Sequence, residues 1–140
     1  MAGKLLLEVV TPEKLLLSQE VDEVIAPGGE GEFGVLPGHC HFLSTLKIGE
    51  LRYRVGGTTR FMAVLWGLAE VTPQKVTILA EIAEKAEDID VERAQAAVEK
   101  AQRRLEVGGL PSELKEAQIS LEKARLRKKI AERAQKIRAR

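Results

Sequence analysis

The chain has 140 residues, of which 44% are hydrophobic and 31% are charged, and its formal net charge at pH 7 is +1. This length leaves little room for a second large core, and no apolar run approaches the roughly 18 residues that span a bilayer. Cys40 is the only cysteine, which excludes an intrachain disulfide, and Glu8 interrupts the apolar run near the N-terminus. We therefore expect a cytosolic protein without a signal peptide.

The first half of the chain alternates short apolar runs with turn signals, a pattern typical of β structure. The runs that predict strands are residues 5–10, 21–26, 51–55, 61–65, 68–71 and 76–80. Gly56-Gly57-Thr58-Thr59 lies between two of these runs and predicts a hairpin loop. Many short strands at a spacing of roughly ten residues favour an antiparallel sandwich or barrel.

After Glu84 the apolar residues recur every three or four positions, which predicts helices. Asp88 or Asp90 can cap a first helix, and Gly108-Gly109 is where we expect it to end. A second helix should begin near Pro111, with Ser112 as its cap. The apolar stripes are Val91, Ala94, Val98, Ala101 and Leu105 in the first helix, and Leu114, Ala117, Leu121 and Ala124, continuing as Leu126, Ile130, Ala134 and Ile137, in the second. Two such helices joined by a Gly-Gly turn form an αα-hairpin.

The predicted fold class is therefore α+β: an N-terminal antiparallel β-sandwich, residues 1–86, followed by a C-terminal αα-hairpin, residues 88–140. Alanine dominates the facing stripes and buries little apolar area, so closing the hairpin gains only modest energy. Opened into one helix, residues 90–137 would reach about 70 Å, so opening changes the reach of the chain. The alternative is a hairpin that stays closed and stabilises the β domain.

Charge is divided unequally between the two halves. Residues 1–87 hold 8 Lys and Arg against 12 Asp and Glu, whereas residues 88–140 hold 14 against 9. Residues 123–140 carry nine basic side chains and the single acid Glu132. The excess of acids in residues 1–87 and of basic residues in 123–140 indicates two surfaces for two different partners.

One stretch of the first half is specific to a family. Gly31-Glu32-Phe33-Gly34-Val35-Leu36-Pro37-Gly38-His39 resembles the G-E-[LF]-G-[IV]-L-P-G-H signature of the ε subunit of bacterial F-type ATP synthases. The motifs around it that follow the order of that family are Val9-Val10-Thr11-Pro12, Leu46-Lys47-Ile48-Gly49-Glu50-Leu51, Trp66-Gly67-Leu68-Ala69-Glu70-Val71 and Lys75-Val76-Thr77-Ile78-Leu79-Ala80. The resemblance covers essentially the full chain, including the order of sandwich and hairpin.

The resemblance implies a non-catalytic subunit of the central stalk. In that family the sandwich contacts the γ subunit and the c-ring, and the hairpin either folds against the sandwich or extends into the catalytic α/β head, where it blocks ATP hydrolysis. The implied location is the cytoplasmic face of the bacterial plasma membrane, which the subunit reaches only through the complex. No cofactor is required, and ATP is a regulatory ligand in some members.

Within the signature, the resemblance assigns Glu32 and His39 to the interface with the c-ring and γ. Glu32 matches an acidic contact to the polar loops of the c-ring. The alternative is that Glu32 is a solvated charge in a turn that the glycines and Pro37 shape. The family commonly has small residues or proline after the matching histidine, whereas Cys40 and His41 follow here.

The cluster His39-Cys40-His41 raises the question of a metal or a nucleophile. Adjacent side chains alternate faces along an extended chain, so the three cannot converge easily on one ion. No other His or Cys exists to complete the four ligands of structural zinc. We expect no metal site, no catalytic residue and no enzymatic turnover by the isolated chain.

A second motif lies at the start of the first helix. Ile89-Asp90-Val91-Glu92-Arg93-Ala94 matches the I/L-D-x-x-R-A motif with which some bacterial members bind ATP. Arg93 supplies a planar fork for phosphate or ribose oxygens, and Asp90 can accept a hydrogen bond from an adenine or ribose donor. The nucleotide contacts that the resemblance implies are Glu84, Ile89, Asp90, Arg93, Ala94, Lys123 and Arg127. Lys100 and Lys123 stand where the family has arginine. The alternative is that Asp90 only caps the helix and pairs with Arg93.

The basic tail is the last candidate site. In the family, cations of the second helix face an acidic segment of the catalytic β subunit, which explains charge of one sign by complementarity. The residues assigned to this contact are Lys123, Arg125, Arg127, Lys128 and Lys129. One alternative is a solvated helix end whose cations suit the helix dipole. Nucleic-acid binding is the other, but with 4% aromatic residues and an acidic β domain we expect no such partner.

Two competing functions stay open. In one, the hairpin is static or insensitive to ATP, and the chain is only a structural coupling subunit. In the other, the chain is a free-standing nucleotide-sensing module outside any motor. Co-purification with the membrane ATPase would separate the second from the rest.

Overall fold

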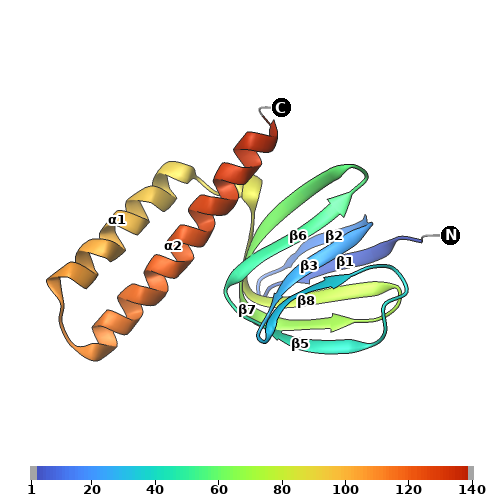
Figure 1. Ribbon diagram of the computed structural model, residues 1–140, viewed down its shortest axis with the longest axis horizontal. Coiled ribbons are helices and arrows are strands. Elements are labelled where there is room, and N and C mark those ends of the chain that lie inside the picture. Colours follow the sequence, from blue (N-terminus) through green and yellow to red (C-terminus); the bar gives the residue numbers. More distant parts are fainter. Residues whose placement is uncertain (1–2, 139–140) are drawn as a thin grey trace. The chain divides into compact units, whose positions relative to one another are not determined.

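The computed structural model describes residues 3–138, with side chains as far as Lys136. The chain divides into two compact units, Met1–Lys85 and Ala86–Arg140. Among the described residues, the first unit contains eight strands and the second two long helices. Figure 1 shows the strands of the first unit and helices α1 and α2 of the second. The predicted fold class, a β-sandwich followed by an αα-hairpin, is confirmed.

The first unit is a sheet of eight strands folded over a common core. The strands are β1 (Leu5–Val10), β2 (Leu15–Val21), β3 (Glu23–Gly28), β4 (Gly31–Val35), β5 (Phe42–Leu46), β6 (Gly49–Val55), β7 (Thr58–Val71) and β8 (Lys75–Lys85). Their order is β2-β1-β8-β7-β5-β3-β4, and β6 pairs with β3 and β7. All strand pairs are antiparallel except β1 with β8, where Val9 lies opposite Ile78 in a parallel ladder. The predicted antiparallel arrangement therefore holds with this one exception.

Alternation along the strands creates the core. In β1, Leu5, Leu7 and Val9 are fully buried, while the residues between them are half-buried. The same inward positions recur in the other strands, and together they form one apolar cluster that includes Met62 and Ile78. In a β-sandwich, the inward-facing residues of two layers of strands pack together in one core.

Strand β7 is longer than the sequence predicted. Residues 61–65 and 68–71 were expected as two strands, but they form one strand of 14 residues. Its first half pairs with β6 and its second half with β5, and the change of neighbour occurs at Trp66-Gly67. Trp66 has φ 54° and Gly67 has φ 154°. A Cβ at Gly67 would lie 2.0 Å from the carbonyl oxygen of Leu79, so only glycine allows β8 to approach this bend.

The second unit begins with a short 3-10 turn, η1 (Ala86–Asp88), followed by α1 (Val91–Val107) and α2 (Pro111–Arg138). Helix α1 ends at Val107 and is capped by Gly108, where a stop was predicted, with φ 81° at that residue. Helix α2 already includes Pro111, so the expectation that Ser112 caps it is wrong: Ser112 is its second residue. Proline suits the first position because the N–H that it lacks would have no partner within the helix.

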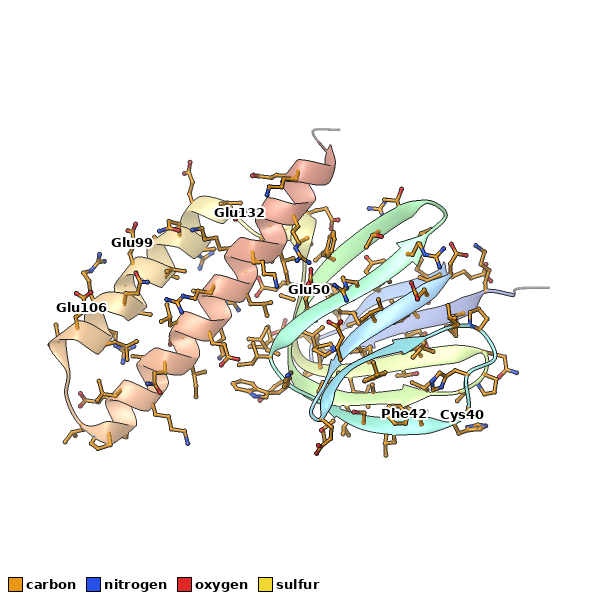
Figure 2. The ribbon with its side chains drawn as sticks, in the orientation of Figure 1. Cys40, Phe42, Glu50, Glu99, Glu106 and Glu132 are labelled. Carbon is orange, nitrogen blue, oxygen red and sulfur yellow. The ribbon has the colours of Figure 1, made fainter. Side chains whose placement is uncertain are left out.

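The facing stripes of the hairpin are confirmed as its interior. Val98 and Ala101 of α1 pack with Leu121 and Ala124 of α2, and Leu105 lies partly buried against them. Ala94 and Ala117 are buried as well. Figure 2 shows Glu99 and Glu106 on the exposed side of α1. The side chain of Ile137, the last residue of the predicted stripe, lies outside the described residues.

Candidate functional site

The N-terminus of α1 carries the first candidate site. Asp90 is its N-cap, and its Oδ1 accepts hydrogen bonds from the backbone N–H of Glu92 at 2.9 Å and of Arg93 at 3.2 Å. Of the two predicted caps, Asp90 is the correct one. A short carboxylate here satisfies N–H groups that have no partner within the helix, and it places negative charge at the positive end of the dipole.

Arg93 and Ala94, the other motif residues on this helix, have opposite environments. Ala94 is buried and allows α2 to approach closely. Arg93 is exposed, and within residues 3–138 its guanidinium forms no ion pair with Asp90 or any other acid. The predicted Asp90–Arg93 side-chain pair is therefore absent from the described part of the chain.

The remaining nucleotide candidates come from three elements. Ile89 lies between η1 and α1, half-buried, and its N–H donates to the carbonyl of Ala86 at 3.2 Å. Glu84 lies near the end of β8 in the first unit. Lys123 and Arg127 lie half-buried on α2. Because α1 and α2 run antiparallel, Arg127, one turn after Ala124, lies toward the Asp90 end of α1.

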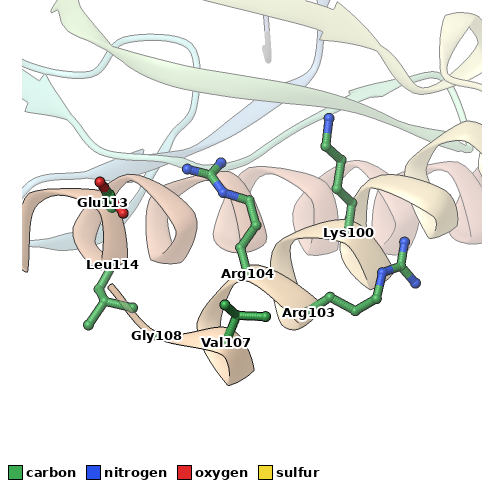
Figure 3. Close-up of a pocket in the computed structure, with 7 residues that line it drawn as sticks. All are labelled: Lys100, Arg103, Arg104, Val107, Gly108, Glu113 and Leu114. Carbon is green, nitrogen blue, oxygen red and sulfur yellow. The ribbon is translucent and has the colours of Figure 1, made fainter. Parts of the chain in front are cut away.

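The hairpin also has a pocket of about 370 Å³ at its closed end. It is lined by Lys100, Arg103, Arg104, Val107, Gly108, Glu113 and Leu114. Figure 3 shows Lys100 and Arg104 extending to the same side of α1, with Arg103 turned away from them. Lys100 lines this pocket, but none of the predicted nucleotide contacts does. The pocket is therefore separate from the Asp90–Arg93 end of α1.

The five cations assigned to the inhibitory contact do not share one face of α2. Residues two positions apart on a helix are turned by about 200°, so Arg125 and Lys129 point away from Lys123 and Arg127. Burial agrees, since Arg125 and Lys129 are exposed while Lys123 and Arg127 are half-buried. Lys128 is half-buried between the two groups. Arg125 and Lys129 are therefore the two exposed members of this set.

In the sandwich, Glu32 lies in β4, and His39 lies in the loop that follows this strand. Glu32 is the second residue of that strand, and its Oε1 accepts a hydrogen bond from Nη2 of Arg52 at 2.7 Å. Its side chain is 53% exposed, so it is a paired surface charge rather than a lone one. The sequence did not identify Arg52, whose position opposite Ile25 is set by the pairing of β6 with β3.

His39 lies in the loop between β4 and β5. Its N–H donates to the carbonyl of Leu36 at 3.1 Å, and its Nδ1 lies 2.8 Å from the carbonyl oxygen of Cys40. Its ring stands 6.2 Å from that of Phe42, and Figure 2 shows Cys40 and Phe42 at the start of β5. Among the residues that the structure describes, no group of three or more His, Cys, Asp or Glu side chains converges as a metal would require.

Comparison with known proteins identifies both structural units. Residues 4–86 match the family model described as ATP synthase, Delta/Epsilon chain, beta-sandwich domain, and residues 87–132 match its long alpha-helix domain. Within residues 3–138, no helix is long and apolar enough to cross a bilayer.

Named relatives agree with the family models. The ATP synthase epsilon chain of Syntrophobacter fumaroxidans is 57% identical over 133 residues, covering 95% of this chain and 99% of that protein. That of Citrifermentans bemidjiense is 52% identical over 137 residues, covering 96% and 98%. A chain of the Euglena gracilis mitochondrial ATP synthase, solved by cryo-EM as an OSCP/F1/c-ring assembly, superposes with a TM-score of 0.79 at 25% identity, covering 96% of this chain and 82% of that one. The protein described here therefore belongs to the ATP synthase epsilon chain family.

Proposed function

We propose that the chain is a non-catalytic subunit of the central stalk that couples the γ subunit to the c-ring and restrains ATP hydrolysis through its hairpin. It is held at the cytoplasmic face of a bacterial plasma membrane by the complex alone. Support comes from the epsilon chain relatives, which align over nearly their full length, and from the F1/c-ring assembly to which the Euglena chain belongs.

The thin interface within the hairpin is the observation that carries the regulatory part of this proposal. Among the described residues, its buried cluster consists of Val98, Ala101, Leu121 and Ala124, with Leu105 partly buried against it, so it holds three side chains larger than alanine. Burying a valine or leucine is worth about 1.5–3 kcal/mol each, before the entropy of ordering two long helices is subtracted. A contact of this size can open when α2 gains a better partner.

ATP would act by holding the hairpin closed. Arg93 offers an exposed guanidinium fork beside the capped N-terminus of α1, and Arg127 lies toward the same end of the hairpin. A ligand that binds only the closed form stabilises it by about 2.7 kcal/mol at a hundredfold excess over Kd. That amount is comparable to the energy of the hairpin interface, so ATP at cellular concentrations would keep the subunit from inhibiting.

The open form would inhibit through the outward cations of α2. Arg125 and Lys129 are exposed, and complementary charge on the catalytic head would attract them. The other cations, Lys123 and Arg127, face a different side of the helix and are assigned here to the nucleotide. The two roles therefore use different residues and can be tested separately.

The turn between the helices offers a direct experiment. Gly108 and Gly109 have φ of 81° and 142°, which alanine adopts only at a cost of about 1–3 kcal/mol. Alanine is also the better residue in a continuous helix by about 1 kcal/mol each. Gly108→Ala/Gly109→Ala should therefore shift the hairpin toward the open form and slow ATP hydrolysis by the assembled enzyme.

The matched control is Gly57→Ala, a turn glycine in the sandwich whose φ is not positive and whose Cβ would enter open space. It should leave hydrolysis unchanged. If the double variant hydrolyses ATP at the rate of the unmodified complex, the hairpin is a static coupling element. If the purified complex lacks this chain altogether, the free-standing module is favoured instead.

A further inference from the structure

The ion pair between Arg52 and Glu32 joins two strands that are not neighbours. Glu32 is the second residue of β4 and Arg52 the fourth residue of β6, and both strands pair with β3. In the register of these strands, Ile25 of β3 lies opposite Gly34 on one side and opposite Arg52 on the other. The contact between Nη2 of Arg52 and Oε1 of Glu32, at 2.7 Å, therefore reaches across a whole strand.

Alternation along the two strands places this pair on the outer face of the sheet. Phe33, next to Glu32 in β4, packs against the core. Leu51 and Tyr53, on either side of Arg52 in β6, are buried in it. Because successive side chains of a strand point to opposite faces, Glu32 and Arg52 both point outward.

Gly34 leaves the space between the two side chains open. It faces outward like Glu32, its φ is not positive, and a Cβ there would lie 3.9 Å from Cγ1 of Ile25, an ordinary contact. Neither the backbone nor the packing therefore requires a glycine at this position. Without a side chain on Gly34, nothing at that position separates the guanidinium of Arg52 from Glu32. Ile25, half-buried on the same face, offers apolar surface to the arginine stem.

The pair fixes one oxygen of the carboxylate and leaves the other one free. Strand β4 lies at the end of the sheet order, so Glu32 has a neighbouring strand on one side only. The Arg52 side chain is 28% exposed and its Nε is buried, whereas the Glu32 side chain is 53% exposed. Within residues 3–138, Oε2 of Glu32 has no hydrogen bond. Glu32 is thus an accessible acceptor that is already held in place.

We propose that Arg52 is a positioning residue for the contact of this chain with the c-ring, because it holds Glu32 in the orientation that the c-ring binds. The inference rests on the proposed function, in which Glu32 meets the c-ring. Ordering a flexible side chain at an interface weakens binding by roughly two- to tenfold, and Arg52 removes this loss before binding. An ordinary surface ion pair would instead add a little stability and leave binding unchanged.

The test uses F1 reconstituted with the full chain, and vesicles that hold the membrane sector with its c-ring. Arg52→Gln removes the guanidinium and should weaken binding of this F1 to the vesicles several-fold, mainly through faster dissociation. Affinity of the same variant for soluble F1, which contains γ but no c-ring, should stay within twofold of the unmodified chain. Thermal unfolding of each variant shows whether the sandwich is intact.

Arg54→Gln is the matched control. Arg54 lies two residues after Arg52 on the same face of β6, and it pairs with Asp22 and Glu23 at 3.9 and 3.8 Å. Its substitution removes the same charge without touching Glu32, so binding to the vesicles should stay within twofold. Arg52→Lys keeps the charge and a donor but loses the planar fork, so it should weaken binding less than Arg52→Gln.

A double variant shows whether Arg52 acts through Glu32. Glu32→Ala should weaken binding to the vesicles at least as much as Arg52→Gln, and Glu32→Ala/Arg52→Gln should bind no more weakly than Glu32→Ala. Losses that add in the double variant would overturn the inference, because Arg52 would then act independently. Tighter binding of Arg52→Gln would also overturn it, since Arg52 would compete with the c-ring for Glu32.

Two further outcomes separate this inference from the proposed function. Binding of Arg52→Gln within twofold of the unmodified chain would overturn the role of Arg52 while leaving the proposed function in place. If F1 with the unmodified chain binds the vesicles no better than F1 that lacks the chain, the proposed function itself is wrong.

Discussion

The side-chain Oδ1 of Asp90 accepts a hydrogen bond from the backbone N–H of Arg93 at 3.2 Å. Asp90 and Arg93 are the aspartate and the arginine of the nucleotide motif. They are linked through the N-cap hydrogen bond of α1 and not through an ion pair between their side chains. Capping and ligand binding are therefore not alternatives: one carboxylate oxygen orders the helix end from which the arginine extends. Substitutions at the two positions should have separable effects.

Replacing Asp90 tests the cap. Asp90→Ala removes the acceptor and should lower the stability of the hairpin by about 0.5–2 kcal/mol, whereas Asp90→Asn keeps an acceptor and should cost a few tenths. Hydrogen exchange of the α1 amides reports the difference. Equal acceleration of exchange in both variants would show that the charge, and not the cap, stabilises the helix end.

Arg93 should affect the ligand without affecting the fold. Its side chain is exposed, so Arg93→Lys should change stability by less than about 0.5 kcal/mol. Lysine keeps the charge but loses the planar fork, so ATP affinity should fall several-fold in calorimetric titration. Arg103→Lys, an exposed arginine on the same helix, is the control and should bind ATP normally. The absence of any heat from the unmodified chain with millimolar Mg-ATP would remove the nucleotide from the account.

Much of this could be predicted from the sequence, and the failures have physical causes. The strands β1 and β8 and both helices follow from alternating or helical apolar patterns. The glycines and Pro37 around Glu32 predict a turn, yet Gly31 and Gly34 pair with β3 and belong to strand β4. Strand β2 begins with three consecutive leucines, so it shows no alternation at its start, and a register irregularity beside Val10 accommodates them.

The sites divide in the same way. Sequence motifs drew attention to Asp90 and Glu32, because each motif is one continuous stretch of the chain. They could not reveal Arg52 as the partner of Glu32, nor the parallel contact of β1 with β8, because these depend on strands that meet only in the fold. Likewise, Val10 and Leu79, which are 69 positions apart, lie opposite each other in the sheet, and this pairing has no signature along the chain.

Asp22 should make the sandwich sensitive to acid. The hydrogen bond from the Lys4 ammonium, followed by that from the Gly56 N–H at 2.8 Å, lowers the pKa of Asp22 below its usual 3.8. Because the folded pKa is the lower one, the stabilisation is complete above pH 3.8 and disappears as the pH falls through the folded value. The Tm difference between the unmodified chain and Asp22→Asn should be constant from about pH 7 to 5 and shrink below about pH 4. A difference that does not change with pH would contradict this.

The outward cations of α2 should be needed only for inhibition. Arg125→Ala/Lys129→Ala removes two exposed charges, so the thermal stability of the hairpin should stay within about 0.5 kcal/mol. Under low ATP, the assembled enzyme should hydrolyse ATP several-fold faster with this variant, because the complementary contact is lost. Lys115→Ala, an exposed cation earlier on α2, is the control and should leave inhibition intact. Unchanged hydrolysis in the double variant would assign inhibition to other residues.

Amide hydrogen exchange of the assembled complex, with and without ATP, tests the opening of the hairpin most directly. The account predicts that the amides of α1 and α2 that pack around Val98 and Leu121 exchange much faster than those of β1 and β8 when ATP is absent, and that ATP slows them. Protection of the hairpin equal to that of the sheet in both conditions would contradict it.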